Sequence, residues 1–265
     1  MIIESAQNKI FKEAMSLKEK KYRQKNGLFL VEGQKQTEEI SGNWHIDSFF
    51  ISKTFSKKNQ FKTNIKSFII ADSLFKKLSS TQTPQGIIAV IEKKSYDIEN
   101  IFKEDGFFII LEKMQDPGNL GTIIRSADAF GAKGIFVSKG SADIYSDKVI
   151  RSTMGSFFHL PIIDECDIQD IIKLMKKEKV KIFAASLDAK TGLKDIVFPT
   201  KSVIIIGNES KGLSLEIQKK ANALIKIEMC GNAESLNAAA AAAIIMYRMA
   251  FSYIKCNIFA KNESK

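Results

Sequence analysis

The chain has 265 residues, of which 45% are hydrophobic and 26% are charged, and its formal net charge is +10. This composition can bury a normal core in one large domain or two ordinary ones, and should be soluble. It contains no apolar stretch near the roughly 18 residues of a membrane-spanning helix, and its N-terminus lacks a signal-peptide pattern. Three cysteines and two histidines lack the spacing of a metal site. The sequence therefore predicts a reduced cytoplasmic protein without membrane or metal.

Most of the excess positive charge lies in the first third of the chain. Residues 1–95 contain 17 Lys and Arg against 9 Asp and Glu, a net charge of +8, whereas residues 96–265 contain 23 against 21, a net charge of +2. A concentrated basic surface attracts polyanions through steering and counterion release. The alternative is a merely solvated lysine-rich face, and we favour nucleic acid as the partner.

The pattern of residues 1–95 predicts a small α/β domain. In chain order we expect a helix over 5–17, strands over 28–32, 49–51 and 68–71, a helix over 73–78, and a strand over 87–91. Asp72 is expected to cap the second helix, and the stretch 83–86 (Thr-Pro-Gln-Gly) is a turn. The charged stretch that follows is poorly patterned, so we place a linker at residues 96–104.

Residues 105–265 predict a second domain in which strands and helices alternate regularly. Strands are expected over 107–111, 134–137, 180–185, 203–206 and 224–229, and helices over 120–130, 147–154, 168–178, 215–221 and 236–254. Because the strands are almost continuously apolar, we expect a parallel sheet that is covered on both faces.

Three segments lie where a predicted strand ends and a helix begins, namely residues 119–125, 207–213 and 227–237. In an open parallel sheet, ligands bind at the carboxyl ends of the strands. None of the segments contains G-x-G-x-x-G or G-K-[ST], so the usual dinucleotide and phosphate loops are absent. The three segments therefore predict one site for another kind of ligand.

Arg125 is the most informative residue of the first segment. The chain has 36 Lys and only 4 Arg, so an arginine here indicates a need for a planar fork, which can grip a phosphate with two hydrogen bonds. The alternative is a surface ion pair with Asp128. Asn119 starts the same helix, where it is either a site residue or only an N-cap.

The other two segments supply further polar candidates. Glu209 lies between two glycines and is a hydrogen-bond acceptor, although a plain turn explains the glycines equally well. Ser235 is expected to cap a long helix with an anion-binding N-terminus, and Asn237 to project from its first turn. The alanines of 238–243 favour helix and also allow close packing. No histidine lies near these segments, so Ser-His-Asp and Cys-His sites are not supported.

Taken in this order, the three segments resemble the motifs of the SpoU/TrmH branch of the SPOUT RNA methyltransferases. Residues 119–127 look like the first motif of the family, 207–213 like the second, and 227–237 like the third. The basic N-terminal domain, with its stretches 29–33 and 83–86, is similar to the ribosomal-protein-like RNA-binding domain of the family.

This resemblance implies an α/β fold with two domains. The C-terminal one is a parallel-sheet SPOUT domain with a deep trefoil knot, and residues 1–95 are a small α/β RNA-binding domain. The family works as a homodimer, binds S-adenosylmethionine, and transfers its methyl group to a ribose 2′-hydroxyl. The N-terminal domain favours ribosomal RNA as the substrate.

The resemblance also assigns roles to single residues. It assigns cofactor contacts, made largely through the backbone, to Gly207, Ile227, Met229 and Leu236. It assigns the catalytic site to Arg125, Asn119, Glu209, Ser235 and Asn237. A free guanidinium has a pKa above about 12, so we expect Arg125 to clamp a phosphate and orient the ribose. Glu228 stands where the family usually has proline, and we expect a glutamate near the pocket to weaken ligand binding or repel RNA.

Two other functions remain open. A non-catalytic RNA-binding or ribosome-assembly factor would keep the fold without the chemistry, and a transfer-RNA ribose methyltransferase would differ only in its substrate. Binding of S-adenosylmethionine distinguishes the first of these from the methyltransferase.

Overall fold

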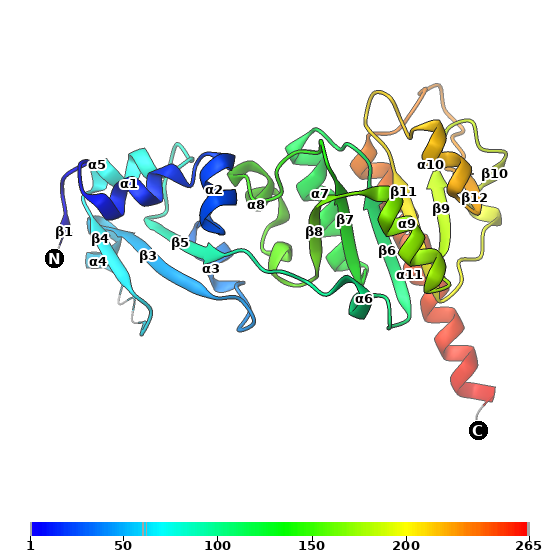
Figure 1. The fold of residues 1–265 in the computed structure, drawn as a ribbon, viewed down its shortest axis with the longest axis horizontal. Coiled ribbons are helices and arrows are strands. Elements are labelled where there is room, and N and C mark those ends of the chain that lie inside the picture. The colour runs from blue at the N-terminus through cyan, green and yellow to red at the C-terminus, as the bar shows by residue number, and fades with distance from the viewer. Residues whose placement is uncertain (1, 60, 62, 264–265) are drawn as a thin grey trace. The chain divides into compact units, whose positions relative to one another are not determined.

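The computed structural model describes residues 2–59, 61 and 63–263, whose helices and strands are drawn in Figure 1. The chain divides into two compact units. The N-terminal unit consists of Met1–Lys94 and Asp143–His159, and the C-terminal unit of Ser95–Ala142 and Leu160–Lys265. The limits of the functional domains, 1–95 and 105–265, stay a prediction.

The N-terminal unit contains a five-stranded mixed sheet with the order β1–β4–β3–β5–β2. Parallel pairs join β1, β4 and β3, whereas β5 is antiparallel to both β3 and β2. The strands are β1 (Ile2–Ile3), β2 (Leu28–Glu32), β3 (Ile46–Ser52), β4 (Ser67–Ile70) and β5 (Ile87–Glu92). The helices are α1 (Lys9–Ser16), α2 (Lys20–Asn26), α3 (Gln34–Glu38), α4 (Lys53–Lys58), α5 (Asp72–Leu78), α8 (Asp147–Thr153) and η1 (Ser156–Phe158).

Helix starts in this unit follow the capping side chains. The helix predicted over 5–17 begins only at Lys9, because the Asn8 side chain accepts hydrogen bonds from the first free N–H groups. The prediction that Asp72 caps its own helix is wrong, since the cap is Ala71. The Asp72 carboxylate instead accepts from the N–H (3.0 Å) and hydroxyl (2.9 Å) of Thr54. It therefore ties the start of α5 to the start of α4.

The segment Asp143–His159 packs with the N-terminal unit although it follows a strand of the other sheet. The Tyr145 ring lies against the Phe29 ring, with centroids 5.0 Å apart. The buried Arg23 guanidinium donates to Asp143 at 3.1 and 2.5 Å. Burial of an ion pair requires such close partners, so this segment is an integral part of the unit.

The C-terminal unit is built on a seven-stranded sheet with the order β10–β12–β9–β11–β6–β7–β8, in which every neighbouring pair is parallel. The strands are β6 (Gly106–Leu111), β7 (Gly134–Ser138), β8 (Ile162–Cys166), β9 (Lys181–Ala185), β10 (Thr191–Gly192), β11 (Lys201–Ile206) and β12 (Ala223–Lys226). The helices are α6 (Ile98–Ile101), α7 (Pro117–Ala129), α9 (Ile168–Lys177), η2 (Leu193–Asp195), α10 (Leu215–Lys220) and α11 (Ala238–Glu263). The predicted parallel sheet is confirmed, and the deep knot stays a prediction.

Helices cover both faces of this sheet. The whole of β6 is buried, and its Phe108 and Ile110 lie in one core with Ile172 and Met175 of α9. On the other side, α11 packs against α7 and against β6 and β11 (Figure 1). Burial on both faces explains why the strands read as continuous apolar runs. No helix among the described residues is long and apolar enough to cross a membrane.

Two helix starts at the predicted site differ from expectation. Asp116 caps α7, and its carboxylate accepts from the N–H of Asn119 at 2.7 Å, so Asn119 is not the N-cap. The prediction that Ser235 caps the last helix is also wrong. The Asn237 side chain is the cap, because its Oδ1 accepts from Ala239 N–H (2.9 Å) and Ala240 N–H (3.3 Å). Asparagine and serine are equally good caps, and the helix starts after the later one.

Candidate functional site

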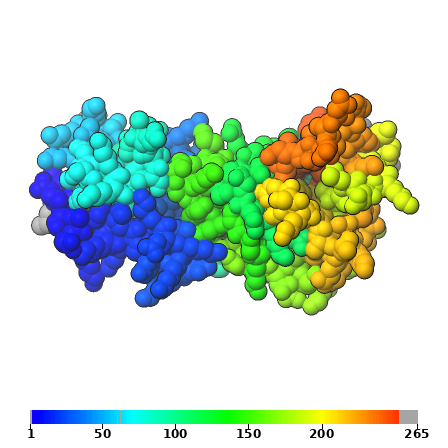
Figure 2. All heavy atoms as spheres, turned by 90° about the horizontal axis from the view of Figure 1, so that it is seen from above, coloured from blue at the N-terminus to red at the C-terminus, as the bar shows by residue number. Residues whose placement is uncertain are grey.

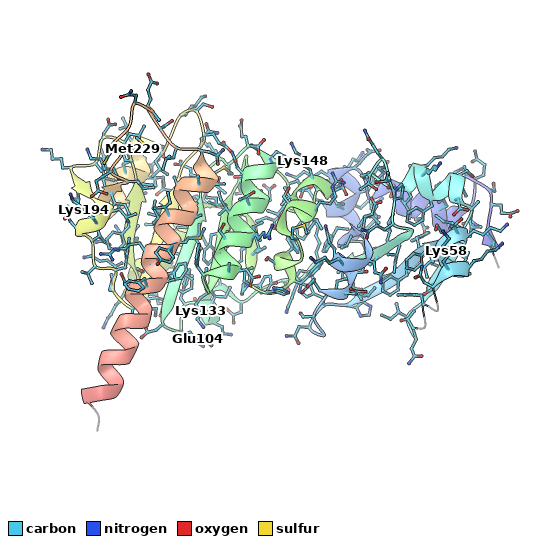
Figure 3. The ribbon with its side chains drawn as sticks, turned by 180° about the vertical axis from the view of Figure 1, so that it is seen from behind. Lys58, Glu104, Lys133, Lys148, Lys194 and Met229 are labelled. Atoms are coloured by element: carbon cyan, nitrogen blue, oxygen red, sulfur yellow. The ribbon has the colours of Figure 1, made fainter. Side chains whose placement is uncertain are left out.

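The three predicted segments lie at the carboxyl edge of the C-terminal sheet. Residues 119–125 belong to α7, which follows β6, while 207–213 follow β11 and 227–237 follow β12. Figure 3 labels Met229 at this edge and the Glu104–Lys133 ion pair (3.4 Å), which precedes β6 and β7, at the opposite edge. The segments therefore occupy the position where parallel sheets bind ligands.

A chain of side-chain hydrogen bonds joins the three segments. Asn119 Nδ2 donates to Glu209 Oε1 at 3.3 Å, and Asn237 Nδ2 donates to Asn119 Oδ1 at 3.0 Å. Asn119 thus uses both ends of its amide, one toward each of the other segments. The structure brings these three predicted site residues together.

Glu209 also fixes the loop that precedes α7. Its carboxylate accepts from the backbone N–H groups of Asp116 (3.1 Å) and Gln115 (3.3 Å). Burial pushes the pKa of Glu209 upward, but hydrogen bonds from its own backbone N–H, from the Asp116 and Gln115 N–H groups and from the Asn119 amide together outweigh burial and hold the pKa below its usual value. Glu209 is therefore a charged acceptor that holds backbone in place.

The loop after β11 depends on glycine at position 207. Asn208 and Gly212 exchange two backbone hydrogen bonds, of 3.1 and 2.9 Å, which fold the loop back on itself. A Cβ atom at Gly207 would overlap the backbone of Gly212 and Leu213. Because backbone cannot move aside as a side chain does, only glycine fits here.

A pocket of about 380 Å³ opens between the second and third segments. Its lining includes all four residues predicted to contact the cofactor, Gly207, Ile227, Met229 and Leu236, together with Glu209 and Ser235. Figure 2 shows the orange loop of residues 227–237 beside the yellow residues that follow β11. The volume lies in the range of about 300–1,000 Å³ that is usual for small-molecule sites.

One part of the pocket was missed by the sequence analysis. Ser186, Leu187 and Asp188 line it directly after the end of β9. The signal was present, since a strand was predicted over 180–185 and its end lies at the same edge of the sheet. The pocket lining therefore contains a second carboxylate, that of Asp188, in addition to the carboxylate of Glu209.

Arg125, Asn119 and Asn237 do not line this pocket. Arg125 is exposed on α7, and its guanidinium makes no hydrogen bond or ion pair with the residues that the structure describes. The alternative surface ion pair with Asp128 is therefore not formed. An exposed guanidinium that has no partner among the described residues is available to an anionic ligand.

Glu228 turns away from the pocket that its neighbours line. Its side chain is exposed and lies over Gly192, and its Oε1 accepts from the N–H of Lys194 at 3.4 Å. Glu228 therefore does not itself line the pocket, and its effect on ligand or RNA binding stays a prediction. Within the described ranges, no cluster of His, Cys, Asp and Glu is arranged to hold a metal ion.

The fold and the site together define an α/β domain with a pocket of small-molecule size at the carboxyl edge of a parallel sheet. The sequence profile of the SpoU rRNA methylase family matches residues 106–247, and that of the MRM3-like substrate binding domain matches residues 8–89. The chain therefore belongs to the SpoU rRNA methylase family, as predicted.

Relatives and solved structures agree with this assignment. The 23S rRNA (guanosine(2553)-2′-O)-methyltransferase RlmP of Bacillus subtilis is 32% identical over 248 residues, which are 93% of this chain and 98% of that protein. An AdoMet-bound rRNA methyltransferase from Sinorhizobium meliloti is 29% identical, with a TM-score of 0.85 over 94% of this chain and 97% of that one. The SpoU methyltransferase AviRb of Streptomyces viridochromogenes, solved with AdoMet (S-adenosylmethionine), is 26% identical with a TM-score of 0.85, over 94% and 99%.

Proposed function

We propose that this protein is an S-adenosylmethionine-dependent methyltransferase that modifies a ribose 2′-hydroxyl of ribosomal RNA. The observation that carries the proposal is the Asn119 amide, which ties Glu209 to Asn237 at the edge of a pocket lined by the predicted cofactor residues. This network joins three segments that are far apart in sequence into one site. Because ribosomal RNA is the substrate, we place the activity in the cytoplasm.

The pocket fits the cofactor in size and chemistry. Ile227, Met229 and Leu236 offer apolar contacts for an adenine ring, and Gly207 lets backbone approach a ligand closely. S-adenosylmethionine supplies a methyl group that is activated by its bond to a positively charged sulfur. The task that remains for the protein is to align the acceptor oxygen and to allow its proton to leave.

Arg125 is proposed to perform the alignment. S-adenosylmethionine would supply the methyl group to the ribose oxygen and leave as S-adenosylhomocysteine, and the hydroxyl proton would pass to solvent water. The guanidinium keeps its own proton and grips an adjacent phosphate with two parallel hydrogen bonds. Correct alignment contributes about 7–11 kcal/mol in favourable cases.

The test compares Arg125→Ala and Arg125→Lys with Lys133→Ala, a control at the opposite edge of the sheet. Both Arg125 variants should bind S-adenosylhomocysteine as the unchanged protein does in calorimetry. Both should lose about 100-fold or more in methyl transfer, since lysine lacks the planar fork. Normal transfer by Arg125→Lys would show that the fork is not used, and normal transfer by Arg125→Ala would remove the residue from the mechanism.

We further propose that the protein works as a homodimer through one face of α11. Ile244, Tyr247 and Phe251 are 43%, 60% and 40% exposed, and the Tyr247 ring contacts Phe130 with centroids 5.9 Å apart. Neighbouring exposed apolar side chains of this size mark interaction surfaces, and a second copy presents the same patch. Tyr247→Lys should convert a dimer to a monomer in sedimentation, and a monomeric unchanged protein would contradict the proposal.

Calorimetry also tests the non-catalytic alternative. A ribosome-assembly factor on the same fold has no need of the cofactor, so failure to bind S-adenosylhomocysteine would favour it. Ribose methylation mapped in ribosomal and transfer RNA, with and without the protein, identifies the substrate. Methylation of transfer RNA alone would overturn the choice of ribosomal RNA.

A further inference from the structure

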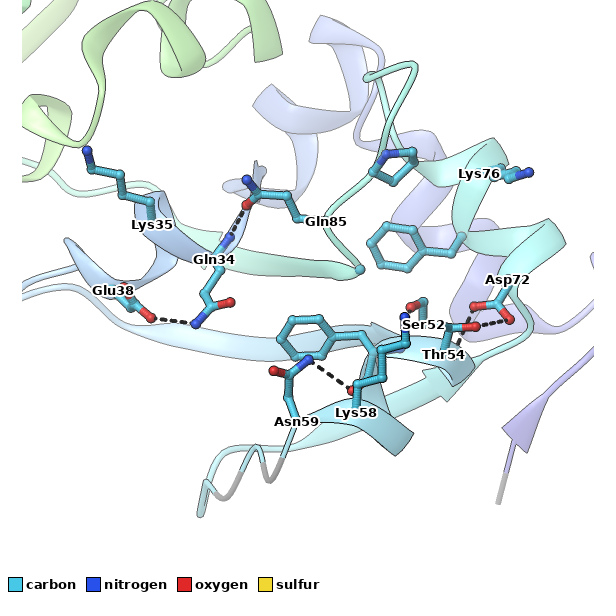
Figure 4. A pocket seen from close by; sticks show the side chains of 14 residues that line it. Gln34, Lys35, Glu38, Ser52, Thr54, Lys58, Asn59, Asp72, Lys76 and Gln85 are labelled. Atoms are coloured by element: carbon cyan, nitrogen blue, oxygen red, sulfur yellow. Dashed lines mark hydrogen bonds between the residues drawn. The ribbon is translucent and has the colours of Figure 1, made fainter.

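A large hollow lies in the N-terminal unit, and none of the residues that line it lines the pocket described above. Its volume is about 1,020 Å³, at the upper end of the range for small-molecule sites. It is formed by the residues that follow β2, by α4 and α5, and by the turn 83–86 before β5, as Figure 4 shows. We call it the N-terminal groove.

Two stretches that the sequence analysis singled out, 29–33 and 83–86, end at this groove. The Gln85 side chain joins them, because its Oε1 accepts from the N–H of Gln34 at 2.8 Å (Figure 4). Gly33 and Gly86 have φ values of +108° and +97°, which side chains rarely adopt. A Cβ at Gly86 would also lie 2.6 Å from the Phe55 Cβ. Gly86 therefore lines the groove, and Gly33 directly precedes the lining residues Gln34 and Lys35.

The carboxylates around the groove have hydrogen-bond partners, whereas its ammonium groups do not have partners among the described residues. Its two carboxylates already accept hydrogen bonds, Asp72 from Thr54 and Glu38 from Gln34 Nε2 at 2.9 Å. In contrast, the ammonium groups that line it form no hydrogen bond or ion pair with the described residues; they belong to Lys35, Lys58 and Lys76. The groove therefore attracts anions.

Amide groups lie among these lysines. Asn59 donates through Nδ2 to the carbonyl oxygen of Phe55 at 3.3 Å, which leaves its Oδ1 as an acceptor. Gln85 uses its Oε1, which leaves its Nε2 as a donor. A donor and an acceptor beside cations that have no partner among the described residues match the edge of a nucleobase and the phosphates next to it.

We propose that the N-terminal groove binds an unpaired segment of the substrate RNA, with Lys58 and Lys76 on phosphates and Asn59 and Gln85 on the edge of a base. A hollow suits bases that are splayed out of a strand, whereas duplex RNA is read by its shape across a wide, shallow minor groove. The inference deepens the proposed function, and rests on it in taking RNA as the substrate.

The test uses two double variants of the full-length chain. Lys58→Ala/Lys76→Ala removes two cations that line the groove, and Lys57→Ala/Lys77→Ala removes the adjacent, exposed lysines of the same two helices, which do not line it. The probes are a mixed-sequence single-stranded RNA of about 12 nucleotides and a duplex of the same length. Fluorescence anisotropy measures binding of each probe over a series of KCl concentrations.

The groove variant should bind the single strand about tenfold more weakly near physiological salt. Its slope of log K against log [KCl] should fall by about 1.4, because each phosphate contact to a single strand contributes about 0.7. The control variant should change this slope by less than about 0.5. Thermal melting should be the same for both variants, since all four lysines are exposed.

If both double variants lost the same affinity for single-stranded RNA, the lysines would act only through general electrostatic attraction, and the proposal would be overturned. So would an unchanged protein that binds the duplex as well as the single strand. Calorimetry with S-adenosylhomocysteine keeps the two proposals apart, because the groove variant should retain cofactor binding. If the unchanged protein binds the single strand in the groove and transfers no methyl group, the proposed function fails while the groove site stands.

Discussion

Asn237 offers the sharpest test of how the candidate site is held together. Its Oδ1 caps α11 and its Nδ2 donates to Asn119, so alanine removes both interactions, whereas serine keeps a cap and loses only the bond to Asn119. Loss of an N-cap costs about 0.5–2 kcal/mol, and loss of a neutral hydrogen bond about 0.5–1.5 kcal/mol. Asn237 is exposed, which favours the lower values. Asn237→Ala should therefore cost about 1–3 kcal/mol and Asn237→Ser about 0.5–1.5 kcal/mol.

The assay is urea unfolding followed by circular dichroism, with the affinity for S-adenosylhomocysteine measured on the same samples. Both variants should bind more weakly than the unchanged protein, because the segment that Asn237 anchors carries Met229 and Leu236 into the pocket. Equal stability of the two variants would refute the capping role. Full stability and full affinity of Asn237→Ser, combined with loss of methyl transfer, would show that the amide acts on the substrate and not as a positioning group.

Three further predictions follow from the same geometry. Gly207→Ala should abolish binding of S-adenosylhomocysteine, measured by calorimetry, because the added Cβ overlaps the backbone of Gly212. The lowered pKa of Glu209 means that its contribution is complete above the usual glutamate pKa of 4.5 and is lost as the pH falls through the lower folded value. Affinity for S-adenosylhomocysteine should therefore drop in that acidic window, and Glu209→Gln should not show this drop. Glu228→Ala should change the affinity less than about threefold, since its carboxylate contacts Lys194 and lies outside the pocket; a larger loss would mean that Glu228 orders the neighbouring loop.

The sequence was sufficient to predict the parallel sheet and the edge at which its ligand site lies. Strands buried on both faces must be apolar throughout, so the end of β11 and the loop 207–213 that follows it are visible in the sequence. The end of β12 is not, because this strand is only partly buried and stops at Lys226, before the predicted end at 229. The side-chain network is not visible, because a bond such as Asn237 to Asn119 depends on the register of two separate strands. The residue that caps α11 is also ambiguous in the sequence, because Ser235 and Asn237 are equally good caps by residue type.

The packing of Asp143–His159 with the N-terminal unit also could not be predicted from sequence patterns. The segment follows β7 of the C-terminal sheet, and nothing in its periodicity indicates that Tyr145 will contact Phe29. This packing changes how RNA binding has to be tested. Deleting residues 1–95 would remove Phe29 and Arg23, the partners of Tyr145 and Asp143, and would expose Tyr145. Loss of RNA binding by a truncated chain could then result from unfolding of the segment that remains. Point variants of exposed lysines avoid that problem.

The positive charges of the protein differ in whether they have a hydrogen-bond or ion-pair partner within the structure. Lysine is abundant throughout the chain, so a net charge of +10 does not by itself locate an RNA surface. At each of the two proposed sites, however, a carboxylate is fixed by hydrogen bonds, while cations of the same unit are left without partners among the described residues. Glu209 and Arg125 show this in the C-terminal unit, and Asp72 and Lys58 show it in the N-terminal unit. Since a paired cation releases few counterions when RNA binds, substitution of unpaired cations should lower the salt dependence of binding. Substitution of a paired lysine such as Lys133, which contacts Glu104, should leave that dependence unchanged.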